Sequence, residues 1–363
     1  MHDEIELKLQ APPTALMDIL GSAFVSQVSV GKVRTRRLVS TYFDTPRHTL
    51  RKDGIALRIR QFQDDFEQTV KAPVPGTAGL QICREWNSKV PGNAPVITAV
   101  DDREVRSILT LGGRHKRLLP LFKTDVERHA LRVRFSGSEI ELALDIGRIE
   151  AGNGSSEPVS ELELDLLSGE SSAVLELALH LTELGDLNLG YLTKAERGYA
   201  LAQPSLQPRA GWADKKGFAH DITVPGMFDA ILNSTLEHLR ANELPVAAGH
   251  PEGVHQARIA IRRLRVALWA FRRVLPKAER KSFNREFRWF QRQLSPARDW
   301  HVFVDETVPT VLSAHPGRRA ATARLRNAAR KENSKATDDI TGLFRDVRYT
   351  RLILRFTLWM AGG

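Results

Sequence analysis

Charged and apolar residues alternate strictly in several segments of residues 1–200, beginning with Glu4-Ile5-Glu6-Leu7-Lys8-Leu9. The same period of two recurs in four later segments: residues 57–60, 131–135, 139–145 and 161–166. Successive side chains of a β-strand point to opposite faces, so this pattern predicts strands with one charged and one apolar face. Helices are expected between these strands, near residues 12–21, 99–111 and 170–185.

The charged faces carry carboxylate pairs on some strands and arginine pairs on others. An open antiparallel sheet would expose such faces to water, and the spacing alone does not exclude that arrangement. A closed barrel would instead bring the charged faces together, and barrels of about eight strands can enclose a small ligand. We therefore expect an α+β chain that begins with an eight-stranded antiparallel β-barrel enclosing a tunnel.

Two strands each place two carboxylates at alternate positions, Glu4 with Glu6 and Glu161 with Glu163. Residues i and i+2 share one face of a strand, and four carboxylates that face one another need a counter-charge. A hard divalent cation with oxygen ligands, Mg²⁺ or Mn²⁺, satisfies that need. Asp145, which closes a third alternating strand, is a further candidate ligand. The same spacing is also typical of exposed strand faces.

Cationic side chains lie on or beside the same strands: Lys8, Arg58, Arg60, Lys71, Arg84, Arg128, Lys194 and Arg197. Arginine binds phosphate oxygens through a planar fork and lysine supplies a point charge, so this set favours a ligand with several phosphoryl groups. The sequence contains no Walker A pattern, no H-E-x-x-H motif and no G-x-S-x-G elbow. A P-loop site is thereby excluded, and neither a zinc protease nor an α/β-hydrolase is supported.

The opening Glu4-x-Glu6-x-Lys8 triplet resembles the signature of the CYTH superfamily, also called triphosphate tunnel metalloenzymes. Seven further motifs follow in the order typical of that family: Tyr42-Phe43-Asp44-Thr45, Ala56-Leu57-Arg58-Ile59-Arg60, Gln68-Thr69-Val70-Lys71, Arg84-Glu85-Trp86, Leu142-Ala143-Leu144-Asp145-x-Gly147, Glu161-Leu162-Glu163-Leu164 and Lys194-x-x-Arg197-Gly198-Tyr199. The family includes class IV adenylyl cyclases, thiamine triphosphatases and inorganic triphosphatases.

The resemblance implies a tunnel in which basic side chains bind a triphosphate and glutamates hold the metal. Glu161 and Glu163 would hold the metal that bridges phosphate oxygens. Glu4 and Glu6 would hold a second metal or orient the attacking water, and Lys8 would act beside them. The remaining basic residues would grip the substrate: Arg58, Arg60, Lys71, Arg84, Arg128, Lys194 and Arg197. Asp44 is expected to cap a turn instead.

The basic excess of the chain lies in its second half. Residues 221–363 hold 25 Lys+Arg and 14 Asp+Glu, a net charge of +11, whereas residues 1–220 have a net charge of −1. Apolar residues recur there at helical spacing, in Ile261, Leu264, Leu268, Phe271 and Leu275, and again in Phe283, Phe287, Phe290 and Leu294. Such stripes predict an all-α helical bundle. We expect three parts: a barrel domain 1–202, a linker 203–221 and a helical domain 222–363.

The helix predicted to begin near Val254 bears a basic stripe: His255, Arg258, Arg262 and Arg265, extended by Arg272. A similar row, Arg285, Arg288 and Arg292, precedes Arg298 on the next helix. Few acids interleave, which favours a docking surface for a long anion over a solvated basic face. Nucleic acid is not the expected anion, because base stacking would favour aromatic residues within the stripe. The nearby aromatics are expected in the core: Trp269, Phe271, Phe283 and Phe287.

Residues 254–265 resemble the opening motif of CHAD domains, a helical family, and Leu294-x-x-Ala297-Arg298-Asp299 fits the same family. CHAD domains often follow a CYTH domain and are associated with inorganic polyphosphate. The resemblance implies polyphosphate binding by five residues: His255, Arg258, Arg262, Arg265 and Arg298. The family has two helical halves, and no second His-x-x-Arg helix follows residue 335, so an incomplete bundle is expected.

Together these features predict a triphosphatase that uses Mg²⁺ or Mn²⁺. The attached basic module favours inorganic triphosphate over an organic one. Adenylyl cyclase, thiamine triphosphatase and a non-catalytic polyphosphate-binding protein are the alternatives. Cys83 is the only cysteine, no run of about 18 apolar residues occurs, and the first residues lack a signal-peptide pattern. We therefore expect a cytoplasmic protein without membrane contacts, in an oligomeric state that the sequence leaves open.

Overall fold

The computed structural model describes residues 2–63, 65–74, 80–190, 192–203, 208–214, 217, 221–314 and 319–362. The chain divides into two compact units, Met1–Gln207 and Pro208–Ala361. Nine of the 19 residues of the predicted linker, 203–221, lie outside the described residues, so its boundaries stay a prediction. Within the described residues, no helix has both the length and the apolar character that a membrane span requires.

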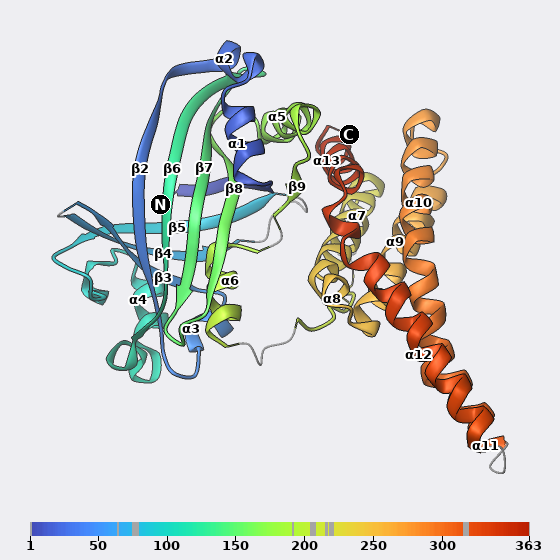
Figure 1. The fold of residues 1–363 in the computed structure, drawn as a ribbon. Coiled ribbons are helices and arrows are strands. Elements are labelled where there is room, and N and C mark those ends of the chain that lie inside the picture. The colour runs from blue at the N-terminus through green and yellow to red at the C-terminus, as the bar shows by residue number, and fades with distance from the viewer. Residues whose placement is uncertain are drawn as a thin grey trace. The chain divides into compact units, whose positions relative to one another are not determined.

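Eight strands of the first unit form an antiparallel sheet that closes on itself (Figure 1). They are β1 (His2–Gln10), β2 (Ser29–Asp44), β3 (Ala56–Phe62), β4 (Asp65–Pro73), β5 (Gln81–Val90), β6 (Leu119–Phe135), β7 (Ser138–Ala151) and β8 (Ser156–Ser168). Their spatial order is β5-β4-β3-β2-β6-β7-β8-β1, and β1 pairs again with β5. The short β9 (Asn188–Leu189) pairs with the end of β1. The predicted eight-stranded antiparallel barrel is confirmed.

The barrel is inverted relative to most small barrels, with its charged face inside and its apolar face outside. Leu57, Ile59 and Val70 belong to a core outside the strands, which includes residues of helix α4 (Arg103–Thr110). A second apolar cluster joins strands β2, β6, β7 and β8 to Tyr199, and its strand residues share the inner face with Arg128, Asp145 and Glu161. The outer faces of β8 and β1 contact helices α1 (Pro13–Leu20) and α5 (Ser171–Leu184). Helices near the three predicted segments are thus present, and they cover the apolar face.

Helix α6 (Lys194–Ala202) differs from the prediction, which placed Lys194 and Arg197 on or beside a strand. A capping box between Thr193 and Glu196 starts this helix, because each side chain accepts a backbone N–H of the other. A Cβ at Gly198 would lie 2.1 Å from a carbon of the Phe122 ring, so only glycine permits this close packing on β6. Helix α6 can therefore hold Lys194 against the barrel.

The second unit is helical, as predicted. Its helices are α7 (Val224–Arg240), α8 (Glu243–Ala247), α9 (Pro251–Ala270), α10 (Lys277–Val302), α11 (Val308–Ala314), α12 (Arg319–Thr341) and α13 (Val347–Ala361). The predicted apolar stripes are buried along α9 and α10, from Ile261 to Leu268 and from Phe283 to Leu294. The Phe287 ring packs edge-on against the Phe356 ring, and the Phe290 ring packs edge-on against the Phe344 ring. Short helices α2 (Ala23–Val28) and α3 (Thr49–Lys52) complete the first unit.

Two expectations about α9 are wrong. The helix ends at Ala270, so Arg272 and Leu275 lie beyond it in the following turn and do not extend its stripes. Trp269 was expected in the core, yet 61% of its surface is exposed. Trp269 directly follows Leu268, the end of the buried stripe, and the chain turns away two residues later, at Phe271. The indole is therefore left on the surface.

The helical core contains a buried carboxyl group, Glu243, which accepts a hydrogen bond from the Tyr349 hydroxyl. Burial raises the pKa of Glu243 to about 7, against a partly opposing effect of Arg240, from an ordinary value of 4.5. A carboxyl whose pKa is raised in the folded state binds more protons than in the unfolded state. Stability therefore falls as the pH rises from the unfolded pKa to the folded one.

We expect the Glu243→Gln variant to gain stability relative to the unchanged chain by about 3 kcal/mol between pH 4.5 and pH 8. The amide keeps the hydrogen bond to Tyr349 but carries no charge at any pH. Urea unfolding of both proteins at several pH values measures the difference. Glu237→Gln, an exposed change on α7, is the control and should follow the unchanged chain. A constant difference across this range would show that Glu243 does not titrate there.

Candidate functional site

The strand register brings the charged residues of four strands together inside the barrel. Glu6 pairs directly with Asp165, and Lys8 pairs with Glu163. Asp145 lies opposite Glu161 on one side and opposite Arg128 on the other. The contacts between β1 and β8 join residues that are more than 150 positions apart in the sequence. The interior holds two carboxylate clusters, and they differ in how their charge is compensated.

The first cluster consists of Asp145, Glu161 and Glu163, whose carboxylate oxygens lie within 4.8 Å of one another. The Lys194 ammonium lies 2.6 Å from Asp145 and 2.9 Å from Glu163, and it also contacts Glu161. Arg128 donates two hydrogen bonds of 2.7 Å to Asp145 and a further one to Glu163. All three carboxylates are buried, and each one has at least one cation in contact.

The protonation of this cluster follows from those contacts. Burial alone would raise the pKa of Glu163, but Lys194, Lys8 and Arg128 outweigh it and hold that pKa well below its usual range. Burial would likewise lower the pKa of Lys194, yet Asp145, Glu161 and Glu163 raise it above its usual range. Glu163 and Lys194 are therefore both charged near neutral pH, and cations in contact with the carboxylates compensate this cluster from within.

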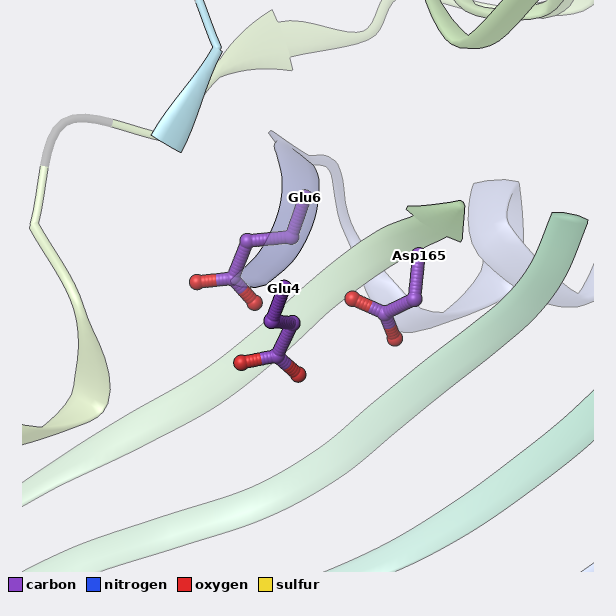
Figure 2. Close-up of side chains that lie close together, drawn as sticks. All are labelled: Glu4, Glu6 and Asp165. Atoms are coloured by element: carbon purple, nitrogen blue, oxygen red, sulfur yellow. The ribbon is translucent and has the colours of Figure 1, made fainter. Parts of the chain in front are cut away.

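The second cluster consists of Glu4, Glu6 and Asp165, and its carboxylates point toward one another from β1 and β8 (Figure 2). Lys8 lies 2.6 Å from Glu6, and Lys71 lies 2.6 Å from Glu4. One buried oxygen of Asp165 has no hydrogen-bond partner among the described residues. Burial and the charges of Glu163 and Glu6 raise the pKa of Asp165 well above its usual range. This cluster thus lacks one positive charge.

Two arginines on β3 show the opposite imbalance. The Arg60 side chain is packed among its neighbours and donates a hydrogen bond of 3.2 Å to the Ser40 hydroxyl, a neutral partner. Burial, followed by the charges of Arg58 and Arg128, lowers the pKa of Arg60 to about 9. The Nε of Arg58 is buried without a hydrogen-bond partner, and its guanidinium lies 4.0 Å from Glu85. A site with buried arginines that lack full counter-charge is suited to bind an anion.

Most of the predicted site residues meet in this interior. Arg197 on α6 donates hydrogen bonds to Glu157 at 2.8 Å and to Glu161 at 3.3 Å. Lys71 lies between Glu4 and Glu85. Asp44 caps a turn as expected, because its carboxylate accepts backbone N–H groups from Thr45, Leu50 and Arg51.

Arg84 is the predicted substrate-binding residue that the structure does not bring to the interior. It lies opposite Ala72 on β4, and both Ala72 and Trp86 pack in the outer core. The neighbouring Glu85 instead points inward, where it contacts Lys71. Adjacent strand residues take opposite faces, so Arg84 and Glu85 cannot both face the tunnel.

Asp165 and Glu85 are interior residues that the sequence argument missed. Asp165 stands two positions after Glu163 on the same alternating strand, so a search of that strand for a third carboxylate would have found it. Glu85 is the middle residue of the Arg84-Glu85-Trp86 motif. Only the alternation of the strand shows that Glu85 faces the interior while its two neighbours face outward.

The helical unit brings together the basic residues of α9 and α10. Arg258 donates a hydrogen bond to the Ser295 hydroxyl across the two helices. Burial lowers the pKa of His255, and the charges of Arg298, Arg258 and Arg262 lower it further, against Glu252. Arg265 lies farther along the helix, where Arg288 and Arg292 are its charged neighbours. The five predicted residues therefore form one basic surface across two helices.

A family model described as CYTH domain matches residues 2–199, more than half of the chain. The chain belongs to the CYTH family. A second family model, CHAD domain, matches residues 230–363 of this CYTH protein. Both resemblances drawn from the sequence motifs are thereby confirmed.

Several known proteins are similar to this CYTH protein. An inorganic triphosphatase from Haemophilus influenzae is 30% identical over 220 residues, which span 59% of each chain. A solved structure from Hippeastrum, reported to reveal a dominant triphosphatase activity, is 18% identical with a TM-score of 0.39, covering 56% of this chain and 96% of that one. The CHAD domain from Ricinus communis is 30% identical with a TM-score of 0.35, covering 42% and 51%. The family assignment rests on the CYTH match.

Proposed function

We propose that the barrel hydrolyses inorganic triphosphate with the help of a divalent cation. The observation that carries this proposal is a carboxylate cluster short of positive charge beside arginines short of negative charge, inside one barrel. A metal ion and a phosphate chain supply the two missing charges. The similarity to an inorganic triphosphatase over 59% of each chain supports the same reaction.

The donor set fits Mg²⁺ or Mn²⁺. Glu4, Glu6 and Asp165 offer oxygen ligands from two strands within 4.8 Å of one another, and hard divalent cations prefer such ligands. The unpartnered oxygen of Asp165 favours a cation at this cluster over the other one. In the first cluster Lys194, Arg128 and Lys8 already occupy the carboxylates. Glu161, Glu163 and Asp145 then serve mainly to hold these cations in place, which leaves the metal at Glu4 and Glu6, one of the two positions that the sequence argument named.

The basic residues position the substrate. Arg58 and Arg60 on β3 have guanidinium groups available for the oxygens of a phosphate chain, and Arg128, which already donates to Asp145 and Glu163, lies near Arg60. Lys8 and Lys71 lie at the border between arginines and carboxylates, next to Glu6 and Glu4. The bound cation supplies further charge to the phosphate oxygens. Glu6 and Glu4 orient a water for in-line attack on the terminal phosphorus, while the arginines and lysines neutralise the departing pyrophosphate.

We further propose that the basic surface of α9 and α10 binds inorganic polyphosphate. His255, Arg258, Arg262, Arg265 and Arg298 provide five positive or titratable groups with few acids among them. Tethering a phosphate polymer beside a phosphatase domain raises the local concentration of its substrate. This arrangement favours inorganic over organic triphosphates, and a cytoplasmic location for the reaction stays a prediction.

The test is a screen of tripolyphosphate, ATP and thiamine triphosphate with Mg²⁺, with Mn²⁺ and with chelator. We expect phosphate release to be fastest from tripolyphosphate and to disappear with chelator. Cyclic AMP from ATP would identify an adenylyl cyclase, and preference for thiamine triphosphate would identify an organic triphosphatase. If the protein binds polyphosphate but releases phosphate from none of the three triphosphates, it is a binding protein and the proposed hydrolysis is wrong.

A further inference from the structure

A pocket of about 380 Å³ lies between α9 and α10 in the helical unit. Six of its lining residues matter for its chemistry: Arg262, Arg265 and Trp269 from α9, and Arg280, Asn284 and Arg288 from α10. No carboxylate is among the described residues that line it. The volume is within the range of about 300–1,000 Å³ that small-molecule sites occupy.

The arginines of this pocket have little negative charge nearby. Arg265 donates hydrogen bonds to the side-chain oxygens of Asn284 at 3.0 Å and Gln291 at 2.5 Å, both neutral. The Nε of Arg280 is buried without a hydrogen-bond partner among the described residues. Four guanidinium groups around one pocket therefore favour an anion with several charged oxygens.

Trp269 gives the same pocket a second kind of surface. Its ring is 61% exposed, although tryptophan is usually well buried. The Arg272 guanidinium lies 4.4 Å from the ring centre, which holds the indole in place. An inorganic phosphate chain has no apolar surface to place against this ring. An anion that also carries a flat aromatic ring would use both the arginines and the indole.

We propose that this pocket binds a nucleotide, with its phosphates on the arginines and its base stacked on Trp269. The sequence argument against a base-bearing ligand relied on four aromatic residues lying in the core, and the exposure of Trp269 removes that argument for this residue. Both a free nucleotide and the end of a single strand offer this chemistry. This site lies in the helical unit, so it does not depend on triphosphatase activity of the barrel.

The experiment measures binding of ADP and of pyrophosphate to the full chain by equilibrium dialysis, with chelator present to prevent hydrolysis. The two probes share a diphosphate and differ by the nucleoside. We expect Trp269→Ala to weaken ADP binding about tenfold and to leave pyrophosphate binding unchanged, because stacking serves only the base. Trp269→Phe should retain most of the affinity for ADP. Trp212→Ala, at another tryptophan with 72% of its surface exposed, is the control. Arg288→Gln should weaken both probes.

Equal affinity for ADP and pyrophosphate, or ADP binding unaffected by Trp269→Ala, would overturn the proposal and leave a site for phosphate alone. Because Trp269 and Arg288 are exposed, both variants should fold, and unchanged melting curves would confirm this. A short oligothymidylate separates the two sources of ligand. Displacement of ADP by the strand at concentrations below the Kd of ADP assigns the pocket to strand ends, and weaker competition assigns it to free nucleotides.

Discussion

Replacing Glu6 with glutamine is expected to lower metal-dependent hydrolysis of tripolyphosphate at least about 100-fold, since even partners behind a metal ligand contribute 10- to 100-fold. Glu6 lies in the cluster with Glu4 and Asp165, and the change removes one of its three negative charges. The rate should recover in part at high Mg²⁺ concentration, because the loss acts through cation affinity. Phosphate release measured across a Mg²⁺ titration gives both quantities.

Folding does not explain this expected loss. Glutamine has the shape of glutamate, and its neutral amide relieves the repulsion that Glu6 exerts on Asp165. It also weakens the ion pair with Lys8, which keeps Glu163 as a partner. The two effects oppose each other, so the melting temperature of Glu6→Gln should stay close to that of the unchanged chain. Glu183→Gln is the matched control, because this glutamate on α5 is 72% exposed and belongs to neither cluster. Full activity of Glu6→Gln at low Mg²⁺ would show that the cation binds elsewhere.

Replacing Lys194 with methionine is expected to destabilise the barrel by about 3–5 kcal/mol, the usual cost of removing one partner from a buried ionic group. The Lys194 ammonium contacts Asp145, Glu161 and Glu163, and none of these carboxylates can reach bulk water. Denaturant unfolding followed by a probe within the barrel measures the effect, because two compact units need not unfold together.

A second substitution makes this result specific. Adding Glu161→Gln to Lys194→Met removes one of the stranded charges and should restore about half of the lost stability. Lys52→Met, on an exposed position of α3, is the control and should change stability by less than about 0.5 kcal/mol. A loss below about 1 kcal/mol for Lys194→Met alone would mean that Arg128 and Lys8 suffice to hold the cluster.

The barrel could be predicted because a period of two survives along nearly every strand, and an interior of this charge is possible only in a closed sheet with bound counter-ions. Glu4, Glu6, Glu161 and Glu163 were found for that reason. Arg84 was assigned wrongly to the interior because, in a motif with charges on adjacent positions, the sequence does not show which of the two residues faces inward. Only the pairing of Arg84 with Ala72, and of Glu85 with Lys71, decides it.

Two other features depended on tertiary contacts that periodicity does not contain. The division of the carboxylates into a neutralised and a charge-deficient cluster depends on Lys194, which comes from a helix that follows the last long strand. The exposure of Trp269 depends on where α9 ends, and neither glycine nor proline marks that end in the sequence. In both cases the sequence showed the residue types but not the tertiary contacts around them.

The pairing of Lys8 with Glu6 and of Lys71 with Glu4 has a thermodynamic consequence. In the proposed site, each ammonium group contacts a carboxylate in the empty tunnel and would contact a phosphate oxygen when the substrate binds. A metal cation that binds the carboxylates would release both lysines for the phosphate chain. A phosphate chain that binds the lysines would in turn leave the carboxylates free for the cation. The two ligands are therefore positively coupled, and by linkage each must raise the affinity of the other by the same factor. An empty tunnel holds Lys8 and Lys71 on its own carboxylates, and it binds either ligand best when the other is present.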